Sequence, residues 1–153
     1  MIIDNNLVLD SAAAITTTRD STNIIDFSIA RDMGDGEALE VIVQVDTALT
    51  STANTTTLTT VFAVSTDNST YTTAAGTSAI NIGGLTAGIE VLNIHVPMRQ
   101  LIIATASGGN AKPRYAKLIY TCSATLSAGK LTAWVGGGRQ TNTGYPSGYT
   151  VAN

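Results

Sequence analysis

Charged side chains are scarce in this 153-residue sequence: Asp, Glu, Lys and Arg make up 12% of it, against about 25% in an average soluble domain. Only three Lys and three Glu are available to cover helix surfaces, which argues against a helix bundle or a coiled coil. The hydrophobic share is an ordinary 44% and the net charge is −3, a combination that argues against intrinsic disorder. The length suits one domain with its own core.

A second cysteine, basic clusters and long apolar runs are also missing. Cys122 is the single cysteine, so neither an internal disulfide nor a multi-cysteine zinc site can form, and the chain suits a reducing cytoplasm. The eight Lys and Arg are scattered singly, whereas nucleic-acid binding depends on clustered basic residues. No stretch of about 18 apolar residues occurs, and the start MIIDNNLVLD lacks the basic region of a signal peptide. We therefore expect no nucleic-acid partner and no membrane partner.

Hydroxyl groups take the place of charge, since the sequence holds 25 Thr and 11 Ser. Threonine is β-branched, which suits a pleated sheet and disfavours a helix. In several stretches apolar residues alternate with polar ones, as in strands with one buried face. Strands are expected at 7–9, 24–30, 39–46, 58–65, 78–82, 89–96, 114–124 and 130–136. Between the first two of these, residues 10–18 are expected to hold one short turn at most.

About eight short strands separated by Gly, Asn, Asp and Ser turns predict an all-β fold, an antiparallel β-sandwich. The spacing alone does not choose between a jelly roll and an immunoglobulin-like order. No internal repeat and no second domain are indicated. After Gly136 the periodicity stops and Gly, Thr and Tyr dominate. We expect a sandwich domain over residues 1–136 and an extended C-terminal arm over residues 137–153.

His95 and Cys122 are the only imidazole and the only thiol, and nucleophilic catalysis would depend on one of them. Both lie inside expected strands, so they are interpreted as a strand-face histidine and a small buried side chain. No G-x-S-x-G nucleophile elbow occurs. We expect no enzyme; a small hydrolase would need His95 or Cys122 beside a carboxylate in a pocket.

Asp32, Asp35 and Glu37 form an acidic cluster. Carboxylate oxygens suit calcium, but this spacing does not match the twelve-residue calcium loop, and Asp-Gly is a common turn pair. A solvated hairpin turn is the preferred interpretation. Gly136-Gly137-Gly138 is followed by neither Lys-Ser nor Lys-Thr, so it is not a phosphate-binding loop. We expect no metal and no cofactor.

Carbohydrate binding on a sandwich would need exposed aromatic rings, and aromatic residues make up only 5% of the chain. Trp134 is the candidate, because it faces away from Ala133 and Val135 in its strand. Its exposure stays open, and packing in a core or an interface is the preferred alternative.

A surface rich in hydroxyls suits a subunit held among neighbours. Burying Thr, Ser and Asn costs less than burying an unpaired charge, and interface cores are depleted in charge. The terminal Tyr-Pro-Ser-Gly-Tyr stretch adds two tyrosines, which are common interface anchors. The candidate contact residues are Tyr145, Pro146, Tyr149 and Val151.

Several segments, taken together and in order, resemble a known family along nearly the whole chain. They are Asp20-Ser21-Thr22-Asn23-Ile24-Ile25-Asp26, Arg31-Asp32-Met33-Gly34, Ser65-Thr66-Asp67-Asn68-Ser69, Arg114-Tyr115, Gly129-Lys130 and Tyr145-Pro146-Ser147-Gly148-Tyr149. The sequence is similar to the small capsid cement, or decoration, proteins of tailed bacteriophages, of the type known from Bordetella phages.

The resemblance implies a jelly-roll β-sandwich on the outer surface of the virion capsid, made in the cytoplasm of the host bacterium. It implies two partners: the phage major capsid protein, whose neighbouring copies it would tie together, and further copies of itself in a dimer or trimer. The family has no catalytic residues, so the resemblance assigns none to this chain. The alternative is a carbohydrate- or receptor-binding β-sandwich module of a phage particle. The chain departs from the family at 47–60 and at 136–138, which leaves the details of its contacts open.

Overall fold

The computed structural model describes residues 5–28, 39–53, 55–96, 103–104 and 110–137. Apart from two single 3-10 turns, η1 (Asn5–Leu7) and η2 (Ile82–Gly84), the regular structure in these residues is all β. The strands are β1 (Val8–Ala14), β2 (Arg19–Asp20), β3 (Ile25–Asp26), β4 (Leu39–Thr50), β5 (Thr57–Ser65), β6 (Thr72–Gly76), β7 (Ile80–Asn81), β8 (Glu90–Val96), β9 (Ile103–Ala104), β10 (Asn110–Ala111), β11 (Tyr115–Cys122) and β12 (Ala128–Gly137).

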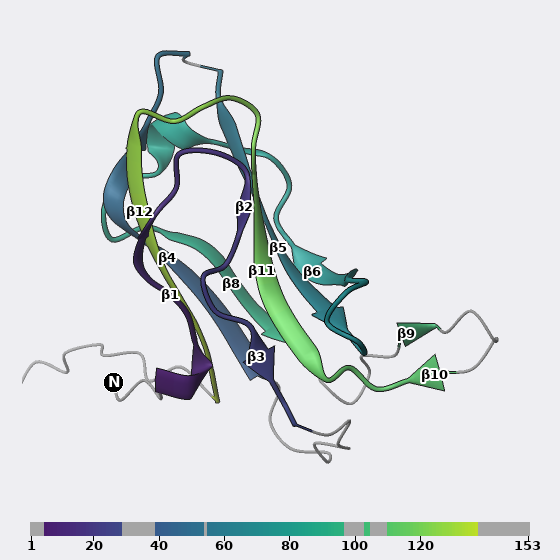
Figure 1. Ribbon diagram of the computed structural model, residues 1–153. Helices are drawn as coiled ribbons and strands as arrows, with labels where there is room; N and C mark the ends of the chain where they lie inside the picture. Colours follow the sequence, from purple (N-terminus) through teal and green to yellow (C-terminus); the bar gives the residue numbers. More distant parts are fainter. Residues whose placement is uncertain (1–4, 29–38, 54, 97–102, 105–109, 138–153) are drawn as a thin grey trace, which may run out of the picture.

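Two antiparallel sheets form the sandwich (Figure 1). Sheet A has the order β1-β12-β4-β8, and sheet B has the order β2-β11-β5-β6, with β3 beside β11 and β7 beside β5. If β2 with β3 and β6 with β7 are each counted as one broken strand, the sandwich has four strands in each sheet. The first and last strands pair, and strands distant in sequence lie side by side, as in a jelly roll. The predicted fold class is thus confirmed, and the strand order identifies a jelly roll rather than an immunoglobulin-like fold.

The core lies between the sheets and follows the alternation in the sequence. From sheet B, Leu58, Phe62 and Val64 point inward with at most 2% of their surface exposed. Val43 and Leu131 of sheet A, both fully buried, belong to the same cluster. The alternation of apolar and polar residues along the sequence therefore identified the buried face of the long strands correctly.

Strand β1 differs from the expectation, because it runs on to Ala14 where residues 10–18 were expected to hold a turn at most. Its pairing with β12 slips between Val8 and Asp10 and again between Asp10 and Ala13, and Ala12 has a φ of 44°. Each slip moves side chains to the other face of the sheet. The alternation that would have revealed the strand is therefore lost.

The expected strands at 24–30 and 78–82 are also shorter in the structure. Asp26 ends β3, and its carboxylate accepts a hydrogen bond from the Ser28 N–H at 2.7 Å, a local turn bond that competes with strand pairing. Asn81 ends β7, because its side chain caps η2 by accepting from Gly83. The unpredicted β6 contains only Thr, Ala and Gly and has no large apolar side chain to show its period.

Strand β12 ends at Gly137, one residue past the expected domain boundary. Gly137, the first residue of the arm expected over 137–153, belongs to this strand, and residues 138–153 lie outside the described part of the chain. Within the described part, the helical segments are single turns, and neither has the length and apolarity to cross a bilayer.

Candidate interaction surface

Four loops without charge meet at one end of the sandwich (Figure 1). They span residues 15–18, 51–56, 82–89 and 123–127 and contain no Asp, Glu, Lys, Arg or His. Three of them meet because β1, β4 and β11 end there, while β2, β5 and β12 begin there. The fourth, residues 82–89, follows β7, which pairs with the first residues of β5. We call these four loops the uncharged end.

Hydrogen bonds join these loops into one surface. The N–H of Leu126 donates to the carbonyl of Thr16 at 2.8 Å, which ties the first loop to the last. The Ser51 hydroxyl donates to the carbonyl of Thr125 at 3.0 Å, which ties the second loop to the last. Because the loops brace one another, the end is preorganised, which lowers the entropic cost of binding.

The exposed side chains of the uncharged end are largely hydroxyls. The exposed hydroxyls belong to Thr16, Thr17, Thr18, Thr52, Thr55, Thr86, Ser123, Thr125 and Ser127, whereas Ala53, Ala87, Ile89 and Ala124 are the exposed apolar residues. A hydroxyl both donates and accepts hydrogen bonds and rotates to suit its partner. The surface is therefore able to pair with backbone or side-chain groups of a neighbouring protein without burying charge.

A cleft of about 470 Å³ opens at this end, between the last residues of β4 and η2. Leu49, Ile82 and Leu85, each 4% exposed, line it and also belong to the core. The remaining lining residues are small or hydroxylated and include Ser51 and Ala53. The cleft thus has apolar groups on its walls and no charged residue along its lining.

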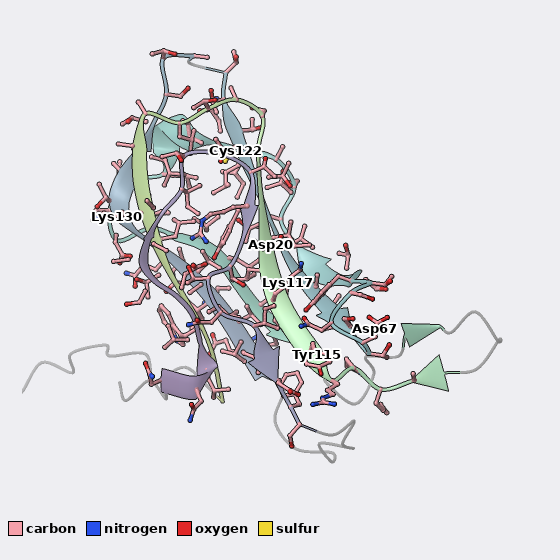
Figure 2. All side chains as sticks on the ribbon, in the orientation of Figure 1. Asp20, Asp67, Tyr115, Lys117, Cys122 and Lys130 are labelled. Carbon is pink, nitrogen blue, oxygen red and sulfur yellow. The ribbon has the colours of Figure 1, made fainter. Side chains whose placement is uncertain are left out.

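Two ion pairs of sheet B, Lys117–Asp20 and Arg114–Asp26, lie away from this end. The Nζ atom of Lys117 on β11 is 2.6 Å from Oδ2 of Asp20. The same atom lies over the ring of Tyr71, 4.0 Å from its centre. Arg114 donates two hydrogen bonds of 2.9 Å to Asp26, and its hydrogen bond holds the pKa of the Asp26 carboxyl below its usual range. Figure 2 shows Lys117 near Asp20, well below Cys122, which lies where β11 reaches the uncharged end.

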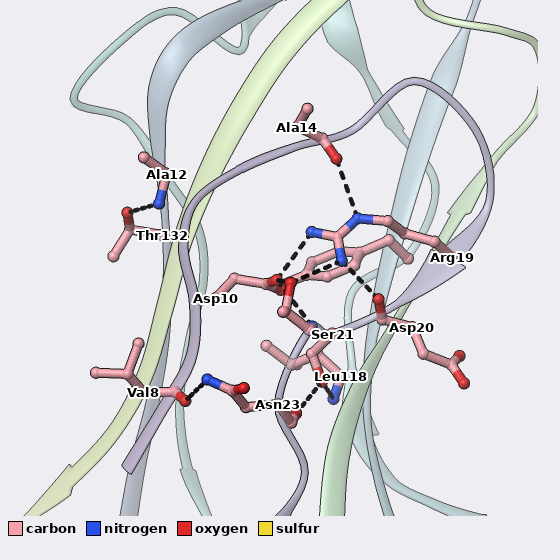
Figure 3. A network of polar contacts seen from close by, with 12 residues as sticks. Val8, Asp10, Ala12, Ala14, Arg19, Asp20, Ser21, Asn23, Leu118 and Thr132 are labelled. Carbon is pink, nitrogen blue, oxygen red and sulfur yellow. Dashed lines mark hydrogen bonds and ion pairs between the residues drawn. The ribbon is translucent and has the colours of Figure 1, made fainter. Parts of the chain in front are cut away.

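A buried polar network supports the loop between β1 and β2 (Figure 3). The fully buried carboxylate of Asp10 accepts hydrogen bonds from Arg19 at 2.9 Å and from the Tyr120 hydroxyl at 2.8 Å. It also accepts from the N–H and the hydroxyl of Thr22. Burial, followed by the charge of Asp10, raises the pKa of Tyr120 well above its usual range. The network links the edge strand β1 to β2 and β11.

The structure does not bring His95 and Cys122 together. His95 lies on β8 in sheet A, where it pairs in register with Glu40, and Cys122 lies on β11 in sheet B, where it pairs with Leu58. Burial raises the pKa of the Cys122 thiol, so its reactive thiolate form is disfavoured. Glu40 is the backbone partner of His95, and neither residue lines the cleft at the uncharged end.

The remaining candidates from the sequence are placed as follows. Trp134 is 7% exposed, so its ring is not an open platform for a sugar, and the preferred packing interpretation fits. Asp32, Asp35 and Glu37 lie outside the described residues, as do Tyr145, Pro146, Tyr149 and Val151. Among the residues that the structure does describe, no group of three or more His, Cys, Asp or Glu could hold a metal ion.

The uncharged end is the feature that reasoning from the sequence missed. Its signal was present, because residues 11–18, 47–66, 68–89 and 118–129 each lack charge. Only the strand order shows that these segments supply neighbouring loops, since they are far apart along the chain.

Comparison with known proteins adds a family to this geometry. No curated protein matches the chain. The family model described as Bbp16 matches residues 9–135, which run from the second residue of β1 to Val135 in β12. Its name points to a protein of a Bordetella phage. The chain belongs to the Bbp16 family.

Proposed function

We propose that this protein is a structural component of a phage virion, one that binds the outer surface of the capsid and cements neighbouring copies of the major capsid protein. The observation that carries the proposal is the uncharged end, four mutually braced loops without a charged residue. Membership of the Bbp16 family supports a phage protein with a structural role. The proposed role involves no catalysis and no cofactor.

The chemistry of the uncharged end suits contact with another protein. Interface cores are depleted in charge, because a charge removed from water without a partner is costly. Hydroxyls and backbone groups are desolvated at lower cost and find partners readily. The charged pairs Lys117–Asp20 and Arg114–Asp26 lie on sheet B instead, which leaves the loops free for an apolar and hydrogen-bonding contact.

The proposed mechanism is mechanical. Packaged DNA presses outward on a capsid, and a subunit that spans neighbouring capsid proteins adds contact free energy that is lost when they separate. Many modest contacts on one shell act together through multivalency. Small homo-oligomers, dimers or trimers, would multiply the contacts made by each bound unit.

Binding to capsids tests the proposal. Purified protein is mixed with capsids of the encoding phage that lack it, the capsids are sedimented, and the bound copies are counted. Thr17→Glu and Thr52→Glu each place a charge on an exposed loop position of the uncharged end, and we expect each to weaken binding by about tenfold or more, because an unpaired charge would be buried. Thr73→Glu, on exposed β6 of sheet B, is the matched control.

Mass spectrometry of purified virions gives an independent test, since a cement protein is expected in a copy number close to that of the major capsid protein. Absence from virions, or a lack of binding to capsids, would overturn the proposed function. If both Glu variants at the uncharged end bind as well as Thr73→Glu, the contact is made by another surface.

A further inference from the structure

We infer that the cleft between β4 and η2 is a docking pocket for a single large apolar side chain, aliphatic or aromatic, carried on an uncharged loop of the major capsid protein. This inference rests on the proposed function and names the chemistry of the contact. Three observations carry it: the lining of the cleft, the rigidity of its walls and the absence of charge around it.

The lining favours an apolar occupant. Leu49, Ile82 and Leu85 line the cleft and are continuous with the core, so an apolar group entering there extends the core outward. A volume of about 470 Å³ lies within the range of pockets that hold a ligand, about 300–1,000 Å³. That space holds one large side chain with part of its flanking backbone.

The walls of the cleft are fixed by hydrogen bonds. The N–H of Ile82 donates to the carbonyl of Thr56 at 3.1 Å, and the N–H of Leu49 donates to the carbonyl of Leu85 at 3.2 Å. The Thr56 hydroxyl is 3.0 Å from the Ser51 hydroxyl and 2.8 Å from the carbonyl of Ala53. A preformed pocket loses little entropy on binding, and such pockets are where single side chains dominate binding energy.

The rim selects the partner by charge and hydrogen bonding. None of the residues that line the cleft is charged, so a charged side chain entering it would find no ion-pair partner in the lining. Exposed Thr86 and half-buried Ser51 line the cleft, and their hydroxyls suit the backbone N–H and C=O groups that flank the inserted side chain. The occupant is therefore an apolar residue on an uncharged loop.

Filling the cleft without adding charge tests this inference. Ala53→Phe and Thr86→Phe enlarge exposed residues that line the cleft. Ala124→Phe enlarges an exposed residue of the uncharged end that does not line it, and serves as the matched control. Each variant is titrated against capsids lacking the protein, after thermal unfolding confirms that it folds as the unaltered protein does.

The expected result is a loss of affinity of about tenfold or more for Ala53→Phe and Thr86→Phe, the size typical of losing an interface anchor, with Ala124→Phe close to the unaltered protein. If all three variants bind like the unaltered protein, the cleft is not occupied and the inference fails. If all three lose affinity equally, the uncharged end binds as a whole and the inference also fails. If the unaltered protein does not bind capsids, the proposed function fails first and the inference fails with it.

Discussion

Among single residues, the fully buried carboxylate of Asp10 is expected to have a large effect on stability. It accepts hydrogen bonds from Arg19, Thr22 and Tyr120. In Asp10→Ala these donors lose their acceptor, and we expect the free energy of unfolding to fall by about 3 kcal/mol. Tyr120→Phe removes one donor only and should cost about 1 kcal/mol. Urea unfolding of both variants measures the difference, and equal losses would contradict the central role of the carboxylate.

At Thr60 we expect a substitution to raise stability rather than lower it. Its hydroxyl is buried in the sandwich with no hydrogen-bond partner among the described residues, whereas the buried Thr56 hydroxyl contacts Ser51 and Ala53. Valine has nearly the same shape as threonine, so Thr60→Val should stabilise the protein by about 1 kcal/mol, because an unsatisfied polar group leaves the interior. Thr56→Val is the matched substitution and should destabilise it. Chemical denaturation compares the two, and a less stable Thr60→Val would show that its hydroxyl has a partner.

At the scale of elements, the second residue of β12, Gly129, has a backbone conformation and a close neighbour that a larger residue would not tolerate. It has a φ of 150°, and a Cβ atom at this position would lie 2.9 Å from Leu49 Cγ on the neighbouring β4. Gly129→Ala should therefore lower the free energy of unfolding by about 1–3 kcal/mol, through backbone strain and overpacking. Gly84→Ala in η2 is the control, since a Cβ atom there meets nothing within 4 Å. A Gly129→Ala protein as stable as Gly84→Ala would contradict the prediction.

The turn between β5 and β6 makes stability depend on pH. The Asp67 carboxylate accepts hydrogen bonds from the N–H groups of Thr70 and Ser69 and from the Ser65 hydroxyl. These bonds hold the pKa of Asp67 well below its ordinary value of 3.8. The folded state therefore keeps this carboxylate ionised at pH values where the unfolded state has bound a proton. Its contribution to stability is present above pH 3.8 and is lost as the pH falls toward the pKa of the folded state.

Removing the titrating group tests this dependence. In Asp67→Asn, the loss of unfolding free energy between about pH 5 and pH 2 should be smaller than in the unaltered protein. Thermal unfolding at a series of pH values measures both curves. Parallel curves would show that the turn does not contribute to acid sensitivity.

At the scale of the whole molecule, the four loops at one end carry no charge, whereas both sheets carry charged residues, among them Asp10 on sheet A and the Lys117–Asp20 pair on sheet B. The tyrosines of the terminal arm form a second candidate contact, predicted from sequence. Deleting residues 144–153 removes Tyr145 and Tyr149, so we expect lower occupancy on capsids. Counting bound copies per capsid checks this prediction. Undiminished binding of the truncated protein would rule out a role for the arm.

Periodicity identified the long central strands because their alternation is regular. Residues 58–65 were expected as a strand, and β5 spans Thr57–Ser65; residues 114–124 were expected, and β11 spans Tyr115–Cys122. The edges were less predictable. The slips in β1 erase its alternation, and the small side chains of β6 carry no signal. A strand that pairs regularly shows an alternation of apolar and polar residues, whereas a strand with register slips does not.

The sequence by itself determined the class of the fold, because a scarcity of charge, an excess of threonine and a period of two are local properties. It also placed the inward face of each long strand. Only the tertiary structure decided the jelly-roll order and the placement of His95 and Cys122 in different sheets. It likewise joined four separate uncharged loops into one surface with a cleft. These features depend on which distant strands pair, and pairing is set by burial across the whole core rather than by neighbours along the chain.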